Sequence, residues 1–387
     1  MQDVKIVIGA NFGDEGKGLM TDYFCSMAPK HERVLNVRFN GGSQAGHTVV
    51  SPDGRRHIFG HFGSGSFLPN VATYFSGDFI VNPIIFRREY EKLSQLKICP
   101  MVYCHPKCIF TMPQDMMVNQ FLETRRGNAR HGSCGMGIYE TILRNKNATP
   151  ENTINYLSVA SVDGMPNIDY YDYERIDKLL GDRLTDEEKA LMINQNIHSR
   201  YCEDVRFFLD HVVIKDESIF DQFNYVVFEG AQGLLLDQNN MDYFPHLTPS
   251  NTGIQNVIPY LTNDMNIKVC YITRPYLTRH GAGILPNECS REEVGAKIDL
   301  TNHTNEWQGS LRYGKLHWPS LIERTIADFQ KVGDLDAKRV IALTHYDEML
   351  KTVQDLKGLG VTYISEGPMR SNIRNLYREV DTYEEEE

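Results

Sequence analysis

The segment VKIVIGANFGDEGKG, residues 4–18, constrains the fold of this chain more than any other part of the sequence. Its apolar start predicts a short buried strand, the glycines after it predict a tight loop, and a helix is expected to begin near Leu19. A loop of this kind directs backbone N–H groups toward an anion, and Lys17 adds a positive charge. The segment therefore predicts a phosphate-binding loop between a strand and a helix.

Two carboxylates in this loop, Asp14 and Glu15, would repel a phosphate group. They fit the site if a Mg²⁺ ion or a proton transfer is also located there. The loop is not a standard Walker A sequence, because Gly18 stands where that pattern has Ser or Thr. We interpret it as a site of catalysis on a phosphate-bearing substrate, with a purely structural strand-to-helix turn as the alternative.

Further strand and helix patterns alternate along the chain. Apolar runs predict strands at residues 33–39, 225–230, 267–273 and 339–346, and helical patterns occur at 85–96 and 184–197. Such alternation favours an α/β fold with a large, mostly parallel central sheet flanked by helices. The polar, helix-rich region at roughly 145–220 predicts an insertion. No domain boundary stands out, so residues 1–387 are expected to form a single domain with insertions.

Composition narrows the class of protein. With 387 residues, of which 41% are hydrophobic, the chain can bury a large core. Its net charge of −11 makes nucleic acid or a membrane surface a poor partner, although a local basic pocket could still hold a nucleotide. No run of 18 apolar residues and no signal-peptide pattern occur, so we expect a cytoplasmic protein.

Two more glycine-rich turns follow predicted strands, which is where open parallel sheets bind ligands. The first, residues 40–48, contains His47, which can give or take a proton near neutral pH. The second, FEGAQG at 228–233, is followed by TPSNTG at 248–253. Gln232, Thr248 and Asn251 in these segments are neutral hydrogen-bonding groups suited to a purine edge or to phosphate oxygens. Each segment could equally be a turn that satisfies its own backbone.

The second half of the chain adds charged candidates. Arg279 and Arg312 are flanked by small residues that leave room for a carboxylate or phosphate to accept two hydrogen bonds from the guanidinium. A predicted strand runs into THYD at 344–347, where Asp347 could accept hydrogen bonds from N1–H and the 2-amino group of guanine. Residues 365–368 could close around the same base.

Taken together and in this order, these segments resemble the motifs of the adenylosuccinate synthetase family. The resemblance rests on GDEGKG (13–18), QAGHT (44–48), FEGAQG (228–233), SNT (250–252), TRHGAG (278–283) and THYD (344–347). It covers nearly the whole chain. It implies a ligase that condenses L-aspartate with C6 of a 6-oxopurine nucleotide through a 6-phosphoryl intermediate, at the expense of a nucleoside triphosphate.

The resemblance also implies roles for individual residues. Asp14 takes the N1 proton of the purine and binds Mg²⁺ together with the Gly46 carbonyl, while His47 acts as an acid and stabilises the transferring group. The nucleoside triphosphate (GTP, ATP or dATP) is expected to contact Gly13, Glu15, Gly16, Lys17, Gly18, Gly46, Thr48, His345, Asp347, Ser365 and Gly367. The purine nucleoside monophosphate is expected to contact Asp14, Lys17, Gln44, Ala45, Gly46, His47, Ser133, Cys134, Arg144, Gln232 and Thr248. L-Aspartate is expected to contact Gly309, Ser310 and Arg312. A homodimer is implied as well, with Arg144 as the arginine that reaches into the partner's site.

Several positions depart from the family pattern. Ser43 and Gln44 replace a His-Asn pair, Ser133 and Cys134 replace two threonines, and His345 replaces a lysine. The arginine-rich aspartate loop is reduced to GSLR at 309–312.

These departures and the shorter length favour a phage-type branch, which would act in the cytoplasm of a host cell. Members of that branch convert dGMP into N6-succino-2-amino-2′-deoxyadenylate and use ATP or dATP. Asp14 argues for the alternative, IMP to adenylosuccinate with GTP, because several phage-type members have serine there. Two remoter alternatives are a nucleotide-binding regulator without catalysis and a small-molecule kinase.

Overall fold

The strand predicted at the start of the chain, β1 (Asp3–Gly9), lies inside a large sheet of the computed structural model. The model describes residues 1–146, 173–298, 309–349 and 355–377. Within these ranges the sheet has ten strands, which follow one another across it as β17 (Ile373–Asn375), β16 (Val361–Ser365), β15 (Ala337–Leu343), β11 (Asn266–Thr273), β1, β10 (Tyr225–Gly233), β2 (Val34–Arg38), β5 (Val71–Phe75), β7 (Val102–Cys104) and β9 (Val213–Ile214). Each neighbouring pair is parallel except β16 with β17.

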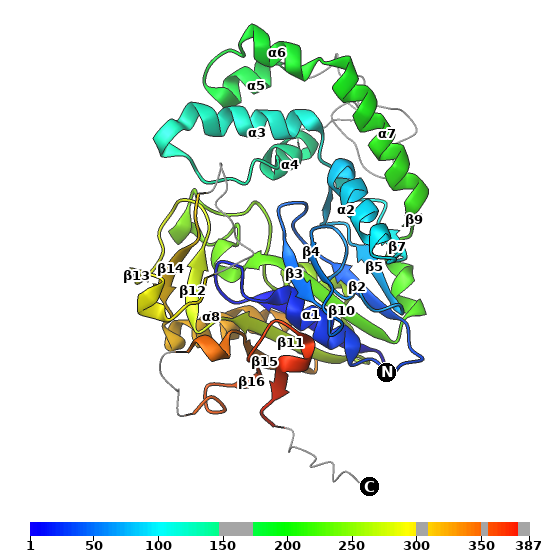
Figure 1. Cartoon of the computed structure of the whole chain (residues 1–387), viewed down its shortest axis with the longest axis vertical. Coiled ribbons are helices and arrows are strands. Elements are labelled where there is room, and N and C mark those ends of the chain that lie inside the picture. The colour runs from blue at the N-terminus through cyan, green and yellow to red at the C-terminus, as the bar shows by residue number, and fades with distance from the viewer. Residues whose placement is uncertain (147–172, 299–308, 350–354, 378–387) are drawn as a thin grey trace.

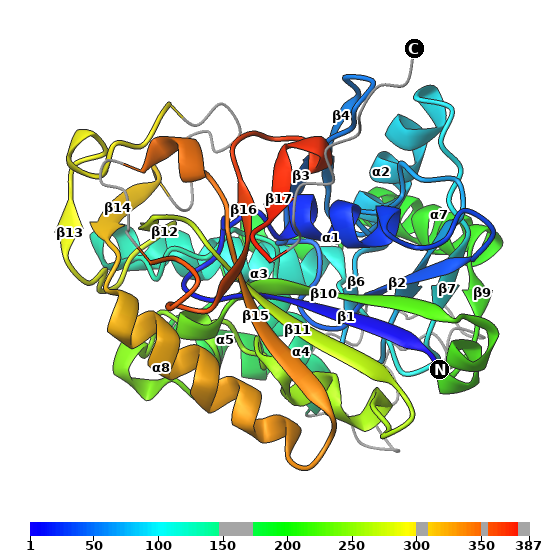
Figure 2. The ribbon, with the colours of Figure 1, turned by 90° about the horizontal axis from the view of Figure 1, so that it is seen from below.

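The apolar residues of β1 face two different cores. Ile6 and Ile8 pack in a cluster with Leu321 of α8 (Trp318–Phe329), and Val7 packs on the other face with Phe24 of α1 (Lys17–Ser26). Figure 2 shows these two helices on opposite sides of the sheet. A parallel strand that is covered on both faces reads as a nearly continuous apolar run, and residues 4–8 display this pattern except at Lys5.

The predicted fold class is therefore confirmed: a mostly parallel central sheet flanked by helices. The four other predicted strands correspond to β2, β10, β11 and β15, and the helix pattern at 85–96 corresponds to α2 (Pro83–Gln95). Smaller sheets are formed by β3 (His47–Val50) with β4 (Arg56–Phe59), by β6 (Ile80–Val81) with β8 (Ile109–Phe110), and by β12 (Tyr276–Arg279), β14 (Arg312–Lys315) and β13 (Glu288–Cys289).

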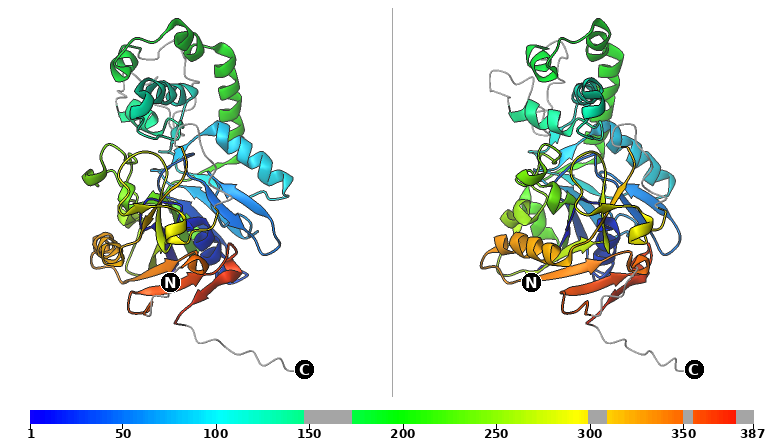
Figure 3. Two further views of the ribbon diagram at one scale, coloured as in Figure 1. Left: turned by 60° about the vertical axis from the view of Figure 1, so that its left-hand side comes forward. Right: turned by 90° about the vertical axis from the view of Figure 1, so that its left-hand side faces the viewer.

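A lobe of helices stands above the sheet in Figures 1 and 3. It contains α3 (Pro113–Arg126), α4 (Ile138–Lys146), α5 (Tyr173–Leu180), α6 (Asp186–Met192) and α7 (Gln195–His211). The helix pattern at 184–197 forms parts of two helices, because the Asn194 side chain accepts hydrogen bonds from Asn196 and Ile197 and so begins α7 anew. Residues 147–172 of the predicted insertion lie outside the described ranges. In the described part, no helix combines the length and the apolar character that a membrane span requires.

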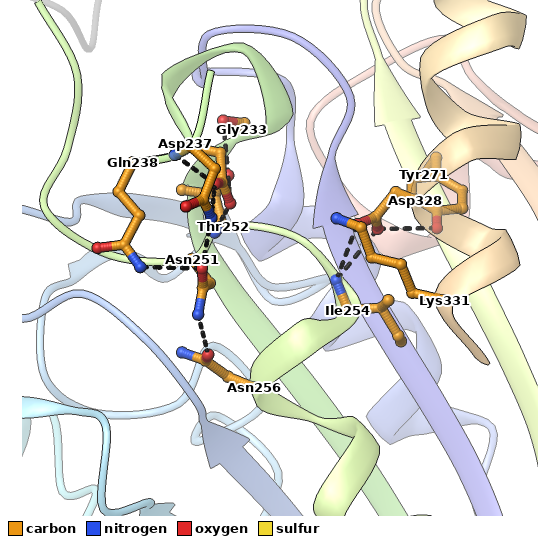
Figure 4. Close-up of polar contacts among 11 residues, drawn as sticks. Gly233, Asp237, Gln238, Asn251, Thr252, Ile254, Asn256, Tyr271, Asp328 and Lys331 are labelled. Carbon is orange, nitrogen blue, oxygen red and sulfur yellow. Dashed lines mark hydrogen bonds and ion pairs between the residues drawn. The ribbon is translucent and has the colours of Figure 1, made fainter. Parts of the chain in front are cut away.

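The loop after β10 is held to the core by buried polar contacts, shown in Figure 4. Thr252 donates its backbone N–H to Asp237 and its hydroxyl to the Gly233 carbonyl, at 2.7 and 3.0 Å. Asn251, predicted as a ligand group, instead exchanges hydrogen bonds with Gln238 and Asn256. The SNT segment is thus a scaffold for the loop.

Asp328 of α8 anchors Ile254, two residues after this segment. Its carboxylate accepts hydrogen bonds from the Ile254 backbone N–H at 3.1 Å and from the Tyr271 hydroxyl of β11 at 3.0 Å, and Lys331 lies 3.0 Å away (Figure 4). Asp328 is buried, so these contacts connect α8, β11 and the loop inside the core.

We predict that Asp328→Ala lowers the free energy of unfolding by about 2–4 kcal/mol, because a buried N–H and a buried hydroxyl lose their acceptor. Tyr271→Phe, which removes one donor from the same carboxylate, is the matched control and should cost about 0.5–1.5 kcal/mol. Urea unfolding of both variants measures the two values. A smaller loss for Asp328→Ala than for Tyr271→Phe would contradict the anchoring role.

Candidate active site

The carboxyl ends of the parallel strands meet at one edge of the sheet, and a cavity of about 1210 Å³ lies there. Its floor is the loop after β1, and its walls come from the segments that follow β2, β10, β11 and β15. Residues of the helical lobe, including Asn119 and Glu140, complete the lining. The sheet and the lobe therefore share one site.

Most of the predicted site residues line this cavity. They are Gly13, Asp14, Glu15, Gly16, Lys17, Gly18, Gln44, Ala45, Gly46, His47, Thr48, Ser133, Cys134, Gln232, Thr248, His345, Asp347 and Gly367. These residues come from seven separate segments of the chain. The structure brings the segments together because each follows a strand of the sheet or belongs to the lobe above it.

The loop after β1 has an unusual backbone. Gly13 and Gly16 have φ angles of 113° and 89°, and Asp14 has a φ of 55°. A Cβ atom at Gly16 would lie 2.8 Å from the Cγ2 of Thr344, so glycine is required there for both conformation and space. The carboxylate of Glu15 accepts hydrogen bonds from the backbone and side chain of Asn11 at 2.6 and 2.7 Å. Burial raises the pKa of Glu15 to about 7, although Lys17 and these hydrogen bonds oppose the rise.

Asp14 pairs with a histidine that the sequence analysis did not single out. Its Oδ2 lies 3.1 Å from Nε2 of His280, and Arg274 donates a hydrogen bond to its backbone carbonyl. Burial alone would raise the pKa of Asp14, but the hydrogen bond and charge of His280, with Arg274 and Lys17, outweigh burial and hold the pKa at about 2. Asp14 is thus an ionised acceptor at neutral pH.

His47 is held by a buried carboxylate. Its Nδ1 lies 2.5 Å from Oε1 of Glu229. Ser64 donates its hydroxyl to the same oxygen and its backbone N–H to Oε2. Burial lowers the pKa of His47 below its usual value, and Glu229 opposes that effect. Burial would raise the pKa of Glu229, but Arg38, His47 and Ser64 hold it below its usual value. In a neutral imidazole that donates Nδ1–H to Glu229, Nε2 is the nitrogen that can accept a hydrogen bond.

Backbone strain is concentrated around the cavity. Five described residues other than glycine have a positive φ, and three of them, Asp14, Gln232 and His345, line the cavity with φ angles of 55°, 63° and 53°. Such conformations cost about 1–3 kcal/mol each and persist where the surrounding structure enforces them. Asp14 and His345 follow the ends of β1 and β15, and Gln232 lies next to the last residue of β10.

Five predicted residues do not line the cavity. Ser365 donates its hydroxyl to the Gly367 carbonyl, and Gly309 and Ser310 are exposed. Arg312 pairs with Glu288 and donates hydrogen bonds to the carbonyls of Gly281 and Gly283, so it supports the TRHGAG loop.

Arg144 is the largest departure from the sequence interpretation. Only 1% of it is exposed, its guanidinium binds Asp115 through two nitrogens at 2.9 and 3.0 Å, and it donates a hydrogen bond to the Phe110 carbonyl. In this structure it joins α4 to the start of α3 inside its own subunit.

Sequence reasoning missed Glu229 and His280 as functional candidates. Glu229 lies inside the FEGAQG motif, and His280 lies between Arg279 and Gly281 of TRHGAG, so both motifs were found while these side chains were overlooked. The signal that could have identified them is the charge of an ionisable residue inside a glycine-rich turn.

A Mg²⁺ ion fits the residues at the floor of the cavity. Mg²⁺ prefers oxygen ligands and binds through one or two carboxylates together with substrate phosphates. Asp14 supplies an ionised carboxylate, 28% exposed, next to the phosphate-type loop, and Gly46 lines the same cavity. In the described ranges no cluster of three or more metal-ligating side chains occurs, so phosphate oxygens would supply further ligands.

Comparisons with known proteins agree on one family. The family model for adenylosuccinate synthetase matches residues 6–310. The chain is 30% identical over 303 residues to the adenylosuccinate synthetase of Acaryochloris marina, a match that covers 76% of this chain and 64%, less than two thirds, of that protein. It is 26% identical over 399 residues to the enzyme of Lactobacillus helveticus, which covers 98% of this chain and 86% of the relative.

Two solved structures share the fold. A fully ligated adenylosuccinate synthetase from Plasmodium falciparum superimposes with a TM-score of 0.68 at 18% identity, covering 96% of this chain and 99% of the other. The succinoaminodeoxyadenylate synthetase of cyanophage S-2L, bound to dGMP and to dATP as an energy donor, gives a TM-score of 0.64 at 15% identity, covering 97% and 95%.

We predict that Arg144→Met lowers the free energy of unfolding by about 3–5 kcal/mol, because it leaves Asp115 buried without its charged partner. Arg87→Met is the control: Arg87 lies 3.1 Å from Asp204 but is 37% exposed, so its loss should cost about 1 kcal/mol or less. Chemical denaturation of both variants tests the contrast. Wild-type stability of Arg144→Met would show that the residue has another role.

Proposed function

Because the chain belongs to the adenylosuccinate synthetase family, we propose that it is a ligase that joins the amino group of L-aspartate to C6 of a 6-oxopurine nucleoside monophosphate. The reaction consumes a purine nucleoside triphosphate. The observation that carries this proposal is that Asp14, Lys17, His47 and Gln232, from three separate motifs, line one cavity. A protein that only binds nucleotides would not need an ionised carboxylate and a histidine beside its phosphate loop.

The chemistry requires activation of the purine. The oxygen on C6 is a poor leaving group, and transfer of the γ-phosphoryl group to it converts it into a good one. Asp14, ionised at neutral pH, accepts the proton from N1 and thereby raises the nucleophilicity of O6. When bound by Asp14 and the Gly46 carbonyl, Mg²⁺ supplies positive charge that offsets the charge of the phosphate oxygens.

His47 and Glu229 act as a pair in this proposal. Glu229 fixes the orientation of the imidazole through Nδ1 and stabilises a positive charge on the ring. In its protonated form, His47 donates a hydrogen bond from Nε2 to the transferring phosphoryl group and stabilises the charge that develops there. Lys17 and the backbone N–H groups of residues 13–18 hold the phosphates.

The remaining contacts define two further subsites. Gln232, Thr248, Ser133 and Cys134, which line the cavity, are assigned to the purine nucleoside monophosphate. L-Aspartate is assigned to the side of the TRHGAG loop, where Arg312 acts by fixing two loop carbonyls. The homodimer remains part of the proposal, without Arg144 as the residue that crosses between subunits.

Two alternative substrates, (d)GMP and IMP, can be assigned to the monophosphate subsite. The changed residues at Gln44, Ser133 and Cys134 support dGMP or GMP, as does the likeness to the cyanophage enzyme that was solved with dGMP. The retained Asp14 and the named function of the curated relatives support IMP. We favour (d)GMP, with N6-succino-2-amino-(deoxy)adenylate as the product.

One assay separates these possibilities. Purified protein with Mg²⁺ and aspartate is given IMP, GMP or dGMP, each with GTP, ATP or dATP, and phosphate release is followed. We expect release that depends on aspartate and is fastest with dGMP or GMP. If phosphate release is fastest with IMP, the protein catalyses the adenylosuccinate reaction. If phosphate release does not depend on aspartate, the protein is a kinase or another phosphoryl-transfer enzyme.

We predict that Glu229→Gln lowers kcat about 10²-fold with little change in KM, because the amide cannot stabilise a charge on His47. In a His47→Asn background the same change should have almost no further effect, since the two side chains act as a unit. Steady-state kinetics of the two single variants and the double variant test this. If the fold-losses in kcat of the two single variants multiply in the double variant, Glu229 has only a structural role.

A further inference from the structure

One end of the cavity contains a chain of polar side chains that the proposed chemistry does not use. Lys297 forms an ion pair with Asp347, and its backbone N–H donates to Glu348 at 3.3 Å. Glu348 also accepts a hydrogen bond from the Tyr276 hydroxyl at 2.5 Å, and that hydroxyl lies 3.3 Å from a guanidinium nitrogen of Arg274. All five side chains line the cavity.

The position of this end indicates which part of a nucleotide it can take. The floor loop carries Lys17 and glycine N–H groups, and it contacts the β15 end directly, because Thr344 donates its hydroxyl to the Glu15 carbonyl at 2.8 Å. Phosphates are attracted to the floor loop and are repelled by Asp347 and Glu348. A triphosphate on the floor loop can therefore extend its uncharged base, and not its phosphates, toward Asp347.

Charge then decides which base is accepted. A carboxylate without a cation beside it accepts hydrogen bonds from two adjacent guanine donors, N1–H and the 2-amino group, and repels the lone pair on N1 of adenine. Here Lys297 is bound to Oδ2 of Asp347, so a base meets an ammonium donor beside the remaining acceptor. Adenine presents the complementary edge, with an amino donor on C6 next to the N1 acceptor.

Building on the proposed function, we propose that Lys297, through its ion pair with Asp347, makes this cavity accept the adenine base of a nucleoside triphosphate in preference to guanine. The Lys297 side chain is 62% exposed and that of Asp347 is 31% exposed. Ion pairs with this exposure are weak, so a base edge can insert between the two groups at little cost. Lys297 is thus a specificity-determining residue for the phosphoryl donor.

The test is calorimetric binding of the Mg²⁺ complexes of adenosine and guanosine 5′-(β,γ-imido)triphosphate to the whole protein. The wild type should bind the adenosine analogue more tightly. Lys297→Met should reduce the ratio of adenine to guanine affinity by about tenfold or more, because the carboxylate then favours two donors. Lys297→Arg, which keeps the charge, should preserve the preference for adenine.

Lys315→Met is the matched control. Lys315 has a 61% exposed side chain and lies 3.5 Å from Glu293, but it does not line the cavity, so the affinity ratio should stay at the wild-type value. If Lys297→Met does not fold, as judged by circular dichroism, Lys297→Gln replaces it. A guanine preference in the wild type, or a ratio that falls less than about fivefold on loss of Lys297, overturns the proposal.

Failure of this inference and failure of the proposed function give different results. If the triphosphate analogues bind with the expected preference for adenine but phosphate release does not depend on aspartate, the ligase proposal fails and the role of Lys297 stands. If phosphate release depends on aspartate but substitution of Lys297 does not change the ratio of adenine to guanine affinity, this inference alone fails.

Discussion

The parallel pairing of β1 with β10 on one side and with β11 on the other determines where every functional group lies. Parallel strands end at the same edge of a sheet, so the loops after β1, β10 and β11 open into a common space. β2 and β15 extend this arrangement by one strand on each side. The cavity is therefore a direct consequence of strand order, and the helical lobe closes it from above.

Within that space the charges are arranged in pairs, each with a different surrounding. Asp14 meets His280 at the partly exposed floor, His47 meets Glu229 in a buried wall, and Lys297 meets Asp347 at the more exposed end. Burial increases the electrostatic interaction within a pair and exposure reduces it. The buried pair suits a proton transfer that requires fixed geometry, and the exposed pair suits a contact that a substrate must replace.

The sequence predicted the fold class, and most of the site residues it indicated line the cavity, because strand periodicity and glycine-rich turns are local signals. It could not predict partners that are distant along the chain. An arginine such as Arg144 is a residue type that often binds ligands. Here, however, its guanidinium donates hydrogen bonds to Asp115, 29 positions away along the chain. Arg312 has the same outcome with Glu288 and the loop carbonyls. Glu229 and His280 were overlooked for the complementary reason, since their importance comes from His47 and Asp14, which only tertiary structure brings near.

The left-handed backbone at Asp14, Gln232 and His345 has an evolutionary consequence. Glycine at any of the three would relax the local conformation and make the folded chain more stable, but it would remove a side chain from the cavity wall. Mutations selected only for thermal tolerance should therefore accumulate at these positions, and selection for turnover should reverse them. At these three positions, a gain in stability of the folded chain would come with a loss of activity.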